Sequence, residues 1–450
     1  MYLRSLAFEN VKLLADATIS FEREGGARQW TVLLGDNGVC KTTILQAIAL
    51  AASGDKLARA LVGNAADYIS ADSPESGARI HAVFAPSCAT GDDADRLAVT
   101  MEVAPGRSDF NGVGAAAARV NEVRGSRRAG FFVVGYGVGR YLPRPGEVAI
   151  PSDPARDRVE GVFDTRHKML GIDFFEALEK RELGRAFAAR VRDVLVAEDP
   201  STREALLPWL ADVELRGQGG LDAMERLLKS RRFALDIGGR KLKLPPTALS
   251  QGYQSIVAWI TDLLGHAFLE SGGDVSPGEL EGIVLLDEID IHLHPTWQRR
   301  IIPILRRVFP KLQFIVTTHS PLVLTGFEAD EVIELVMRDG YVHADAVVVE
   351  PAAQSASQLL TRYFDVPVAA RPEIARKESR YLELKAKSSR STEEQSELDA
   401  LEAELTPYFA SPARDPRGDE VEIAGSTVAA LPLDERVRRM EAKIRKMGGA

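Results

Sequence analysis

A glycine-containing segment followed by Lys-Thr-Thr has residue types and spacing suited to binding phosphate. It consists of Gly35, Asp36, Asn37, Gly38, Val39, Cys40, Lys41, Thr42 and Thr43. A buried strand is expected before it and an apolar helix after it, so backbone amides and the helix N-terminus would face a bound phosphate. In this P-loop pattern Lys41 reaches the β- and γ-phosphates, and the Thr42 hydroxyl holds Mg²⁺. A chance glycine-rich turn is the competing interpretation.

The P-loop pattern is broken at one position. GxxxxGK[ST] requires a second glycine, and this chain has Cys40 there. Glycine at that point permits unusual backbone angles and a close approach of phosphate, so a Cβ would cost of order 1 to 3 kcal/mol in strain or binding. Hydrolysis is therefore expected to be slow or impaired.

Two adjacent carboxylates, Asp287 and Glu288, end the apolar run of residues 283–286. They would lie at the carboxyl end of a parallel strand, close to the P-loop. Asp287 would orient Mg²⁺ and its waters, and Glu288 would act as the base that polarises the attacking water. Taken alone, such a pair is more often made of surface carboxylates, so its meaning depends on the other motifs.

Two further segments place polar groups beside apolar elements. Ser250, Gln251 and Gly252 open an apolar helix within LSQGYQS, where a hydroxyl and free amides would form a second anion site. An ordinary N-cap formed by Ser250 is the alternative. His319 follows the expected strand of residues 313–317 and would sense the γ-phosphate, although a single histidine there is more often structural.

In their order along the chain, these motifs resemble those of the ABC-type ATPase superfamily. They comprise a P-loop, an LSxGxxS motif, an apolar strand ending in Asp-Glu, a D-loop-like IDIHLHP and a switch histidine. DEIDIHLHPTWQ and TTHSP resemble the soluble branch that includes OLD-family ATPases, RecF and SMC-like proteins. With GYGVGR and a terminal helical hairpin, the chain is most similar to AAA-type ATPases of antiphage systems such as Septu and PARIS. Besides Cys40, it departs from the family by having residues 136–140 where a Q-loop glutamine is expected, and by Pro303 in the following helix.

The resemblance implies ATP and Mg²⁺ as cofactors, and a homodimer or a larger homo-oligomer as the assembly. In the family the LSxGxxS motif contacts nucleotide on the opposite protomer. The implied roles are phosphate binding by residues 35–43, metal binding by Thr42 and Asp287, catalysis by Glu288, γ-phosphate sensing by His319, and contact across the dimer by Ser250 and Gly252.

The leading hypothesis is an ATPase that dimerises on nucleotide and acts as a sensor or regulator in antiphage defence. Its effector, a nuclease or toxin, would be a separate protein, because nothing after His319 supplies the DxD cluster of the Toprim nuclease found in OLD-family proteins. The alternative is a RecF-like or SMC-like DNA repair ATPase that clamps DNA. Nucleic acid is thus a candidate partner, with phosphate contacts from Arg124, Arg127 and Arg128, or from Arg231 and Arg232.

Strands that alternate with helices predict an α/β fold with a parallel, helix-covered sheet. We expect an ABC-type P-loop ATPase sheet with an inserted arm, a helical lobe and a C-terminal helical hairpin. The predicted divisions are residues 1–172 for the N-terminal part of the core with an arm at about 53–129, residues 173–232 for the helical lobe, residues 233–350 for the C-terminal part of the core, and residues 351–450 for a helical tail.

Composition favours a globular cytoplasmic protein. Apolar residues make up 45% of the 450 residues, and charged residues 27%. The formal net charge of -9 argues against a uniformly basic surface for nucleic acid. Cys40 and Cys88 are too few for a disulfide framework, and we expect neither a signal peptide nor a membrane-spanning run of about 20 residues.

Overall fold

The structure, a computed structural model, divides into two compact units, Met1–Leu359 and Leu360–Ala450. The motifs predicted to do chemistry all lie in the first unit. The residues that the structure describes are 1–24, 26–86, 96–114, 120, 132–143, 151–171, 174, 181–199, 202–203, 205–207, 209–215, 231–237, 239–245, 248–354, 356–364, 376–377, 380–381, 384–385 and 391–409.

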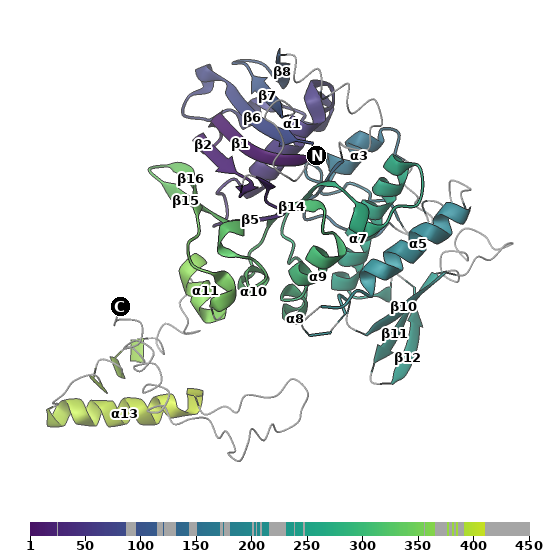
Figure 1. Ribbon diagram of the computed structural model, residues 1–450. Coiled ribbons are helices and arrows are strands. Elements are labelled where there is room, and N and C mark those ends of the chain that lie inside the picture. The colour runs from purple at the N-terminus through teal and green to yellow at the C-terminus, as the bar shows by residue number, and fades with distance from the viewer. Residues whose placement is uncertain are drawn as a thin grey trace. The chain divides into compact units, whose positions relative to one another are not determined.

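A six-stranded sheet carries the predicted motifs (Figure 1). Its strands are β5 (Trp30–Leu34), β9 (Val133–Tyr136), β13 (Gly282–Leu286), β14 (Leu312–Thr317), β15 (Val332–Arg338) and β16 (Tyr341–Ala346). The order is β16-β15-β5-β14-β13-β9, with all strands parallel except β16, which pairs antiparallel with β15. Strands β5, β13 and β14 are buried along their whole length, which explains their continuous apolar sequences. The strands predicted at these three places are confirmed.

A second sheet, antiparallel and five-stranded, has the order β2-β1-β6-β7-β8. Its strands are β1 (Tyr2–Val11), β2 (Leu14–Ser20), β6 (Ala78–Ala85), β7 (Leu97–Val103) and β8 (Asn111–Val113), and a short ribbon of β3 (Glu22–Arg23) and β4 (Gly26–Ala27) lies nearby in the chain. Part of the segment predicted as an inserted arm thus belongs to this sheet. In β6, Ile80, Ala82 and Phe84 point inward and His81 outward, the alternation expected of a half-buried strand.

Helix α1 (Lys41–Leu61) packs against both sheets. Its predicted inner face, formed by Ile44, Leu45 and Ile48, is fully buried. These side chains join one apolar cluster that runs from strands β1, β6 and β7 to Ile283 and Leu285 of β13. The helix extends beyond the predicted end at residue 52, with a break at Gly54, whose φ of 70° is open to glycine at little cost.

The buried side chain of Gln313 ties the two sheets together. Gln313 lies in β14 and is fully buried. Its Oε1 accepts a hydrogen bond from Leu3 N at 2.7 Å, and its Nε2 donates to Leu3 O at 2.9 Å and to Arg28 O at 3.0 Å. Because Leu3 belongs to β1, this one amide of β14 links the six-stranded sheet to the five-stranded sheet.

We expect Gln313→Met to destabilise the protein, because a thioether of similar length leaves these buried backbone groups without partners. The unfolding free energy should fall by about 2 to 5 kcal/mol. Each buried group left without a partner costs about 1 to 3 kcal/mol, and partial relaxation of the structure reduces the sum. Urea unfolding followed by circular dichroism measures it. Gln29→Met is the matched control, since the Gln29 amide also bonds carbonyl oxygens, those of Phe309 and Pro310, but at the protein surface. Equal stability losses in the two variants would contradict the assignment.

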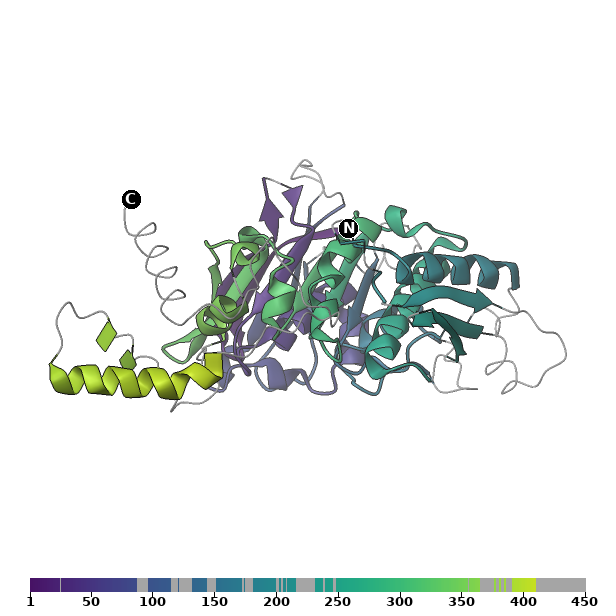
Figure 2. The same ribbon diagram turned by 90° about the horizontal axis from the view of Figure 1, so that it is seen from below.

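Helices α5 (Arg181–Leu195) and α7 (Gln251–Ser271) lie side by side in both views of the ribbon (Figures 1 and 2). Their contact includes an edge-to-face pair between Phe187 and Phe268, with ring centroids 5.5 Å apart. Helix α7 was predicted at residues 252–269 and is confirmed. Over the described part of the chain, every helix is too short or too polar to cross a lipid bilayer.

A small antiparallel sheet, β10-β11-β12, follows α5 in the chain. Its strands are β10 (Leu210–Leu215), β11 (Arg231–Ile237) and β12 (Arg240–Leu244), and the last two form an antiparallel hairpin. Strand β10, however, falls within the segment predicted as a helical lobe. Its strand conformation comes from pairing with β11, where Val213 lies opposite Phe233, and such a tertiary pairing leaves little trace in a short sequence.

The helix predicted after the Asp-Glu strand is divided into α8 (Pro295–Gln298) and α9 (Ile301–Val308). Pro303 is the third residue of α9, where a backbone N–H has no helical acceptor. In a continuous helix its ring would meet the carbonyl of Arg299, so the division precedes the proline. Three further helices of the described first unit are α3 (Pro154–Glu160), α10 (Pro321–Leu324) and α11, which begins there (Ala356–Tyr363).

The described part of the second unit is a helical pair. Helix α13 (Thr392–Phe409) presents Leu398 and Leu405 to Tyr381 and Leu384, which come from the preceding helical residues. Arg380 forms a 2.9 Å ion pair with Glu397, and Lys377 pairs with Glu404. Lys377, the earlier of the two basic residues, pairs with Glu404, the later of the two acidic residues. The two segments are therefore antiparallel, as in the predicted helical hairpin.

Candidate nucleotide-binding site

The carboxyl ends of four neighbouring parallel strands bring the predicted motifs to one edge of the six-stranded sheet. The P-loop follows β5, His319 follows β14, Asp287 follows β13, and residues 137–140 follow β9. In open parallel sheets, ligands bind outside this edge. The order of the strands therefore places groups far apart in sequence around one location.

Lys41 folds back over the P-loop. Its Nζ donates hydrogen bonds to the carbonyl oxygens of Gly35 and Asp36, each at 2.7 Å. Burial lowers the pKa of Lys41, while the carboxylates of Asp287 and Glu288 act in the opposite direction. These bonds hold the Lys41 side chain against the backbone of the loop, within reach of an anion bound there. Gly35 cannot be replaced here, because a Cβ would lie 2.5 Å from the carbonyl oxygen of Leu335.

Asp287 is hydrogen-bonded on both sides. Its Oδ2 accepts from the Thr42 hydroxyl at 2.7 Å, and its Oδ1 accepts from the Thr317 hydroxyl at 2.6 Å. The Thr317 hydroxyl in turn accepts from the backbone N–H of Glu288 at 2.7 Å. The residues predicted to share a metal ion, Thr42 and Asp287, are therefore in direct contact.

Arg140 fixes the backbone of the Asp287-Glu288 pair, and the sequence analysis gave it no role. Its guanidinium donates to the carbonyl oxygen of Asp287, to that of Glu288 at 2.6 Å and to that of Gly137 at 2.9 Å. Burial lowers the pKa of Arg140 to about 10, against the raising effect of Asp287, so the group stays charged near neutral pH. The one hint in the sequence was GYGVGR, whose glycines permit close packing: a Cβ on Gly139 would lie 2.0 Å from Thr165 O.

Cys40 adopts the backbone conformation that the P-loop pattern reserves for glycine. It precedes α1 as its N-cap, with φ 62° and ψ 19°, in the left-handed region. A non-glycine residue in this region carries a cost of roughly 1 to 2 kcal/mol. The strain expected from the sequence is thus present in the fold, and the cysteine has not shifted the loop to a relaxed conformation.

The LSQGYQS motif packs on the segment that follows the Asp-Glu pair. Ser250 is the exposed N-cap of α7 and makes no side-chain capping bond, so its hydroxyl is not used by the helix. A Cβ on Gly252 would lie 2.6 Å from the carbonyl oxygen of His292, which explains the glycine. Tyr253 and Trp297 form an edge-to-face pair with centroids 4.9 Å apart.

His319 is half-buried and follows β14. Its backbone N–H donates to Asp290 Oδ1 at 3.3 Å, and the Thr318 hydroxyl donates to the same oxygen. Asp290 thus holds the histidine loop beside the segment that follows Glu288. Arg124, Arg127 and Arg128, the arginines predicted to contact DNA in the alternative function, lie outside the described residues, as do the side chains of Arg231 and Arg232.

Comparisons with known proteins find similarity over parts of the chain. A family described as "AAA domain, putative AbiEii toxin, Type IV TA system" matches residues 162–325. The retron Ec83 probable ATPase of Escherichia coli is 43% identical over 107 residues, 23% of this chain and 20% of that protein. The Septu protein PtuA of Bacillus mycoides (strain KBAB4) is 25% identical over 347 residues, 76% of this chain and 42% of that protein. Over these residues the chain is similar to ATPases of antiphage systems.

The matched regions span less than half the length of these relatives. Among solved structures, an SMC head bound to the C-terminal winged-helix domain of ScpA aligns with a TM-score of 0.48 at 17% identity, covering 78% of this chain and 99% of that chain.

If the site binds ATP, we expect Cys40→Gly to raise the affinity of the protein for ATP or its rate of hydrolysis, because glycine adopts φ 62° without strain. ATP affinity is measured by titration calorimetry and hydrolysis by phosphate release. Cys40→Ala is the control that removes the sulfur and keeps the Cβ, and it should behave like the parent. Equal or weaker ATP binding by the glycine variant would mean that the loop has adapted to cysteine.

Proposed function

We propose that the site binds ATP with Mg²⁺ and hydrolyses the γ-phosphate. The observation that carries this proposal is the pair of hydrogen bonds that Asp287 accepts from Thr42 and Thr317. Residues 35–43 surround the phosphates, and Lys41 supplies the cation opposite the β- and γ-phosphates. A hydroxyl and a carboxylate oxygen are the hard donors that Mg²⁺ prefers, so the Thr42 and Asp287 pair fits the ion. Bound there, Mg²⁺ would neutralise phosphate charge.

Glu288 is proposed as the group that positions and polarises the attacking water. It follows Asp287 directly and is only half-buried, so water can reach it. Its backbone has φ 47°, and it is held by Arg140 at its carbonyl and by Thr317 at its N–H. Because the Glu288 backbone is held in place, its side chain leaves the main chain at a fixed position, and a catalytic base needs such positioning. His319, on the adjacent loop, is proposed to contact the γ-phosphate.

Glu288→Gln should keep ATP binding and slow hydrolysis by about 100- to 10,000-fold, the usual contribution of a positioned general base. Single-turnover decay of radiolabelled ATP measures the rate, and titration calorimetry measures the affinity. Glu281→Gln is a control of the same chemistry, because Glu281 is an exposed carboxylate before β13. Unchanged decay in the Glu288 variant would assign the water to another residue.

We further propose that two copies of the chain pair head to tail and complete each other's sites. Ser250, Gln251 and Gly252 open α7 with an exposed hydroxyl and free backbone amides. Within one chain this helix start packs on the His292 segment. A second chain related by a two-fold axis would present the same groups to the nucleotide, giving two equivalent sites.

A mixture of two variants tests this pairing. Ser250→Arg should leave ATP binding by the monomer nearly intact and abolish nucleotide-dependent dimerisation, because its bulk occupies the docking position. Lys41→Ala should weaken ATP binding itself. A dimer of one copy of each has one site with both motifs intact and one with neither, so pairing on ATP should be measurable in the mixture and absent from either variant alone. Sizing chromatography with light scattering detects it. Normal dimerisation of Ser250→Arg alone would overturn the shared-site model.

The biological role that we propose is an ATP-gated sensor or regulator of a separate effector protein, a nuclease or toxin, in antiphage defence. Support comes from the similarity to the Septu and retron proteins, although the matched regions cover only part of those proteins. The proposal assigns nucleotide binding and dimerisation to this chain and the destructive chemistry to its partner.

A further inference from the structure

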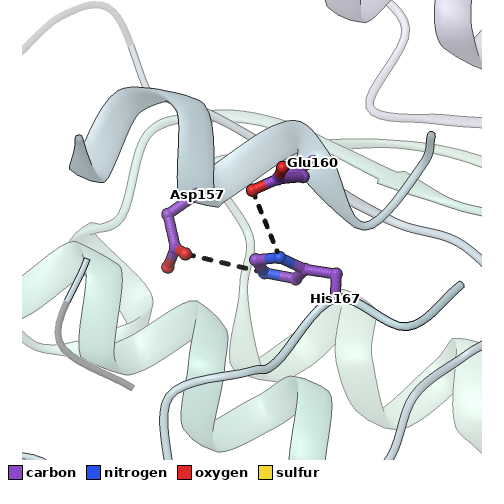
Figure 3. Close-up of side chains that lie close together, drawn as sticks. All are labelled: Asp157, Glu160 and His167. Carbon is purple, nitrogen blue, oxygen red and sulfur yellow. Dashed lines mark ion pairs between the residues drawn. The ribbon is translucent and has the colours of Figure 1, made fainter. Parts of the chain in front are cut away.

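Three side chains with metal-binding donors meet beside α3, and none of them belongs to the candidate nucleotide site. Asp157 and Glu160 lie one turn apart on this helix and project from the same face. Figure 3 shows the imidazole of His167 between the two carboxylates. Its Nε2 is 3.8 Å from Asp157 Oδ1, and its Nδ1 is 3.6 Å from Glu160 Oε2. One donor atom from each of the three residues lies within 4.8 Å of the other two.

A second observation comes from the other side of Asp157. His266 of α7 is 1% exposed, and among the described residues neither of its ring nitrogens has a hydrogen-bond partner. Its Nε2 faces Asp157 Oδ2 at 3.2 Å, and this oxygen also lacks a hydrogen bond within the described structure. Buried imidazoles normally donate or accept at least one hydrogen bond, and here His266 Nε2 and Asp157 Oδ2 meet without one, so both atoms can turn toward a ligand.

The neighbouring polar groups are already engaged in other contacts. Asp262 lies 3.6 Å from His266, but its carboxylate accepts from the Tyr136 hydroxyl at 3.0 Å and from Leu170 N at 2.6 Å. Arg156 pairs with Glu160 Oε1 at 2.7 Å, and Oε2 is the oxygen that faces His167. The open donors are therefore those of Asp157, Glu160 Oε2, His167 and His266.

We propose that Asp157, Glu160 and His167 bind a divalent transition-metal cation such as Zn²⁺, with His266 as a further donor. Imidazole nitrogens combined with carboxylate oxygens suit zinc, whereas Mg²⁺ prefers oxygen ligands alone. Neighbouring ligands about 2.0 to 2.1 Å from a tetrahedral zinc are roughly 3.3 Å apart, close to the 3.2 Å between Asp157 and His266. The separations of 3.6 and 3.8 Å belong to different ring nitrogens of His167, so one ion would take a single nitrogen. Side-chain rotations would bring that nitrogen and the two carboxylate oxygens, one donor atom from each residue within 4.8 Å of the other two, to this spacing.

The ion would join elements that belong to different parts of the core. Asp157 and Glu160 lie on α3, His167 follows that helix in the chain, and His266 lies on α7. The ion pair between Arg158 and Glu270, at 2.8 Å, already holds α3 to α7 on the same side. A metal at this position would strengthen that link, and the site is independent of the nucleotide.

Metal binding to the full chain tests the proposal. Protein stripped with EDTA is titrated with ZnCl₂ without nucleotide, by calorimetry and by metal analysis after gel filtration. We expect one Zn²⁺ per chain. His167→Gln should weaken zinc binding by about 100-fold or more. Loss of a residue that only hydrogen-bonds a metal ligand already costs about 10- to 100-fold, and His167 is proposed to bind the ion directly. His343→Gln is the matched control, because this histidine is exposed on β16, and it should bind zinc like the parent.

Glu160→Gln is a second test of the site in case the histidine variant fails to fold. It keeps the shape of a partly exposed side chain and removes the negative charge of a proposed ligand. It should also weaken zinc binding, and circular dichroism verifies that both variants are folded. Absence of stoichiometric zinc in the parent, or parent-like affinity in folded His167→Gln, would overturn the proposal. The three side chains would then form ion pairs only, and the nucleotide site would be unaffected by that result.

Discussion

The two hydrogen bonds accepted by the carboxylate of Asp287 connect the parts of the nucleotide site. Thr42 belongs to the start of α1, Thr317 ends β14, and Asp287 itself follows β13. A buried carboxylate without such partners would be costly, so the contacts stabilise the fold and the site together. They are available only because β5, β14 and β13 are adjacent and parallel, with their carboxyl ends on one edge. The core of the first unit is organised around this meeting point.

Backbone strain lies on both sides of that meeting point. Cys40 and Glu288 both have positive φ, at 62° and 47°, although neither is glycine. Each is held by its surroundings, Cys40 by the start of α1 and Glu288 by bonds from Arg140 and to Thr317. Strained residues persist where neighbouring contacts fix them, and they concentrate at functional sites.

Local patterns were enough to predict the parts of the site that are contiguous in sequence. The P-loop, the Asp-Glu pair and the strands that precede them are visible because buried parallel strands are continuous apolar runs. Arg140 was missed because its role consists of hydrogen bonds to the carbonyl oxygens of Asp287 and Glu288, far along the chain, and no side-chain pattern marks a backbone acceptor. Strand β10 and the pairing of β6 with β1 likewise depend on partners distant in sequence.

The contact between Gly252 and the carbonyl oxygen of His292 has a consequence for communication between sites. His292 lies four residues after Glu288, while Gly252 belongs to the helix start proposed to serve the partner's nucleotide. With no side chain between them, the two segments touch through their backbones and cannot slide independently. In a head-to-tail pair, a displacement of the loop after one catalytic carboxylate would therefore be transmitted to the opposite nucleotide, and the two hydrolysis events would be coupled through steric contact alone.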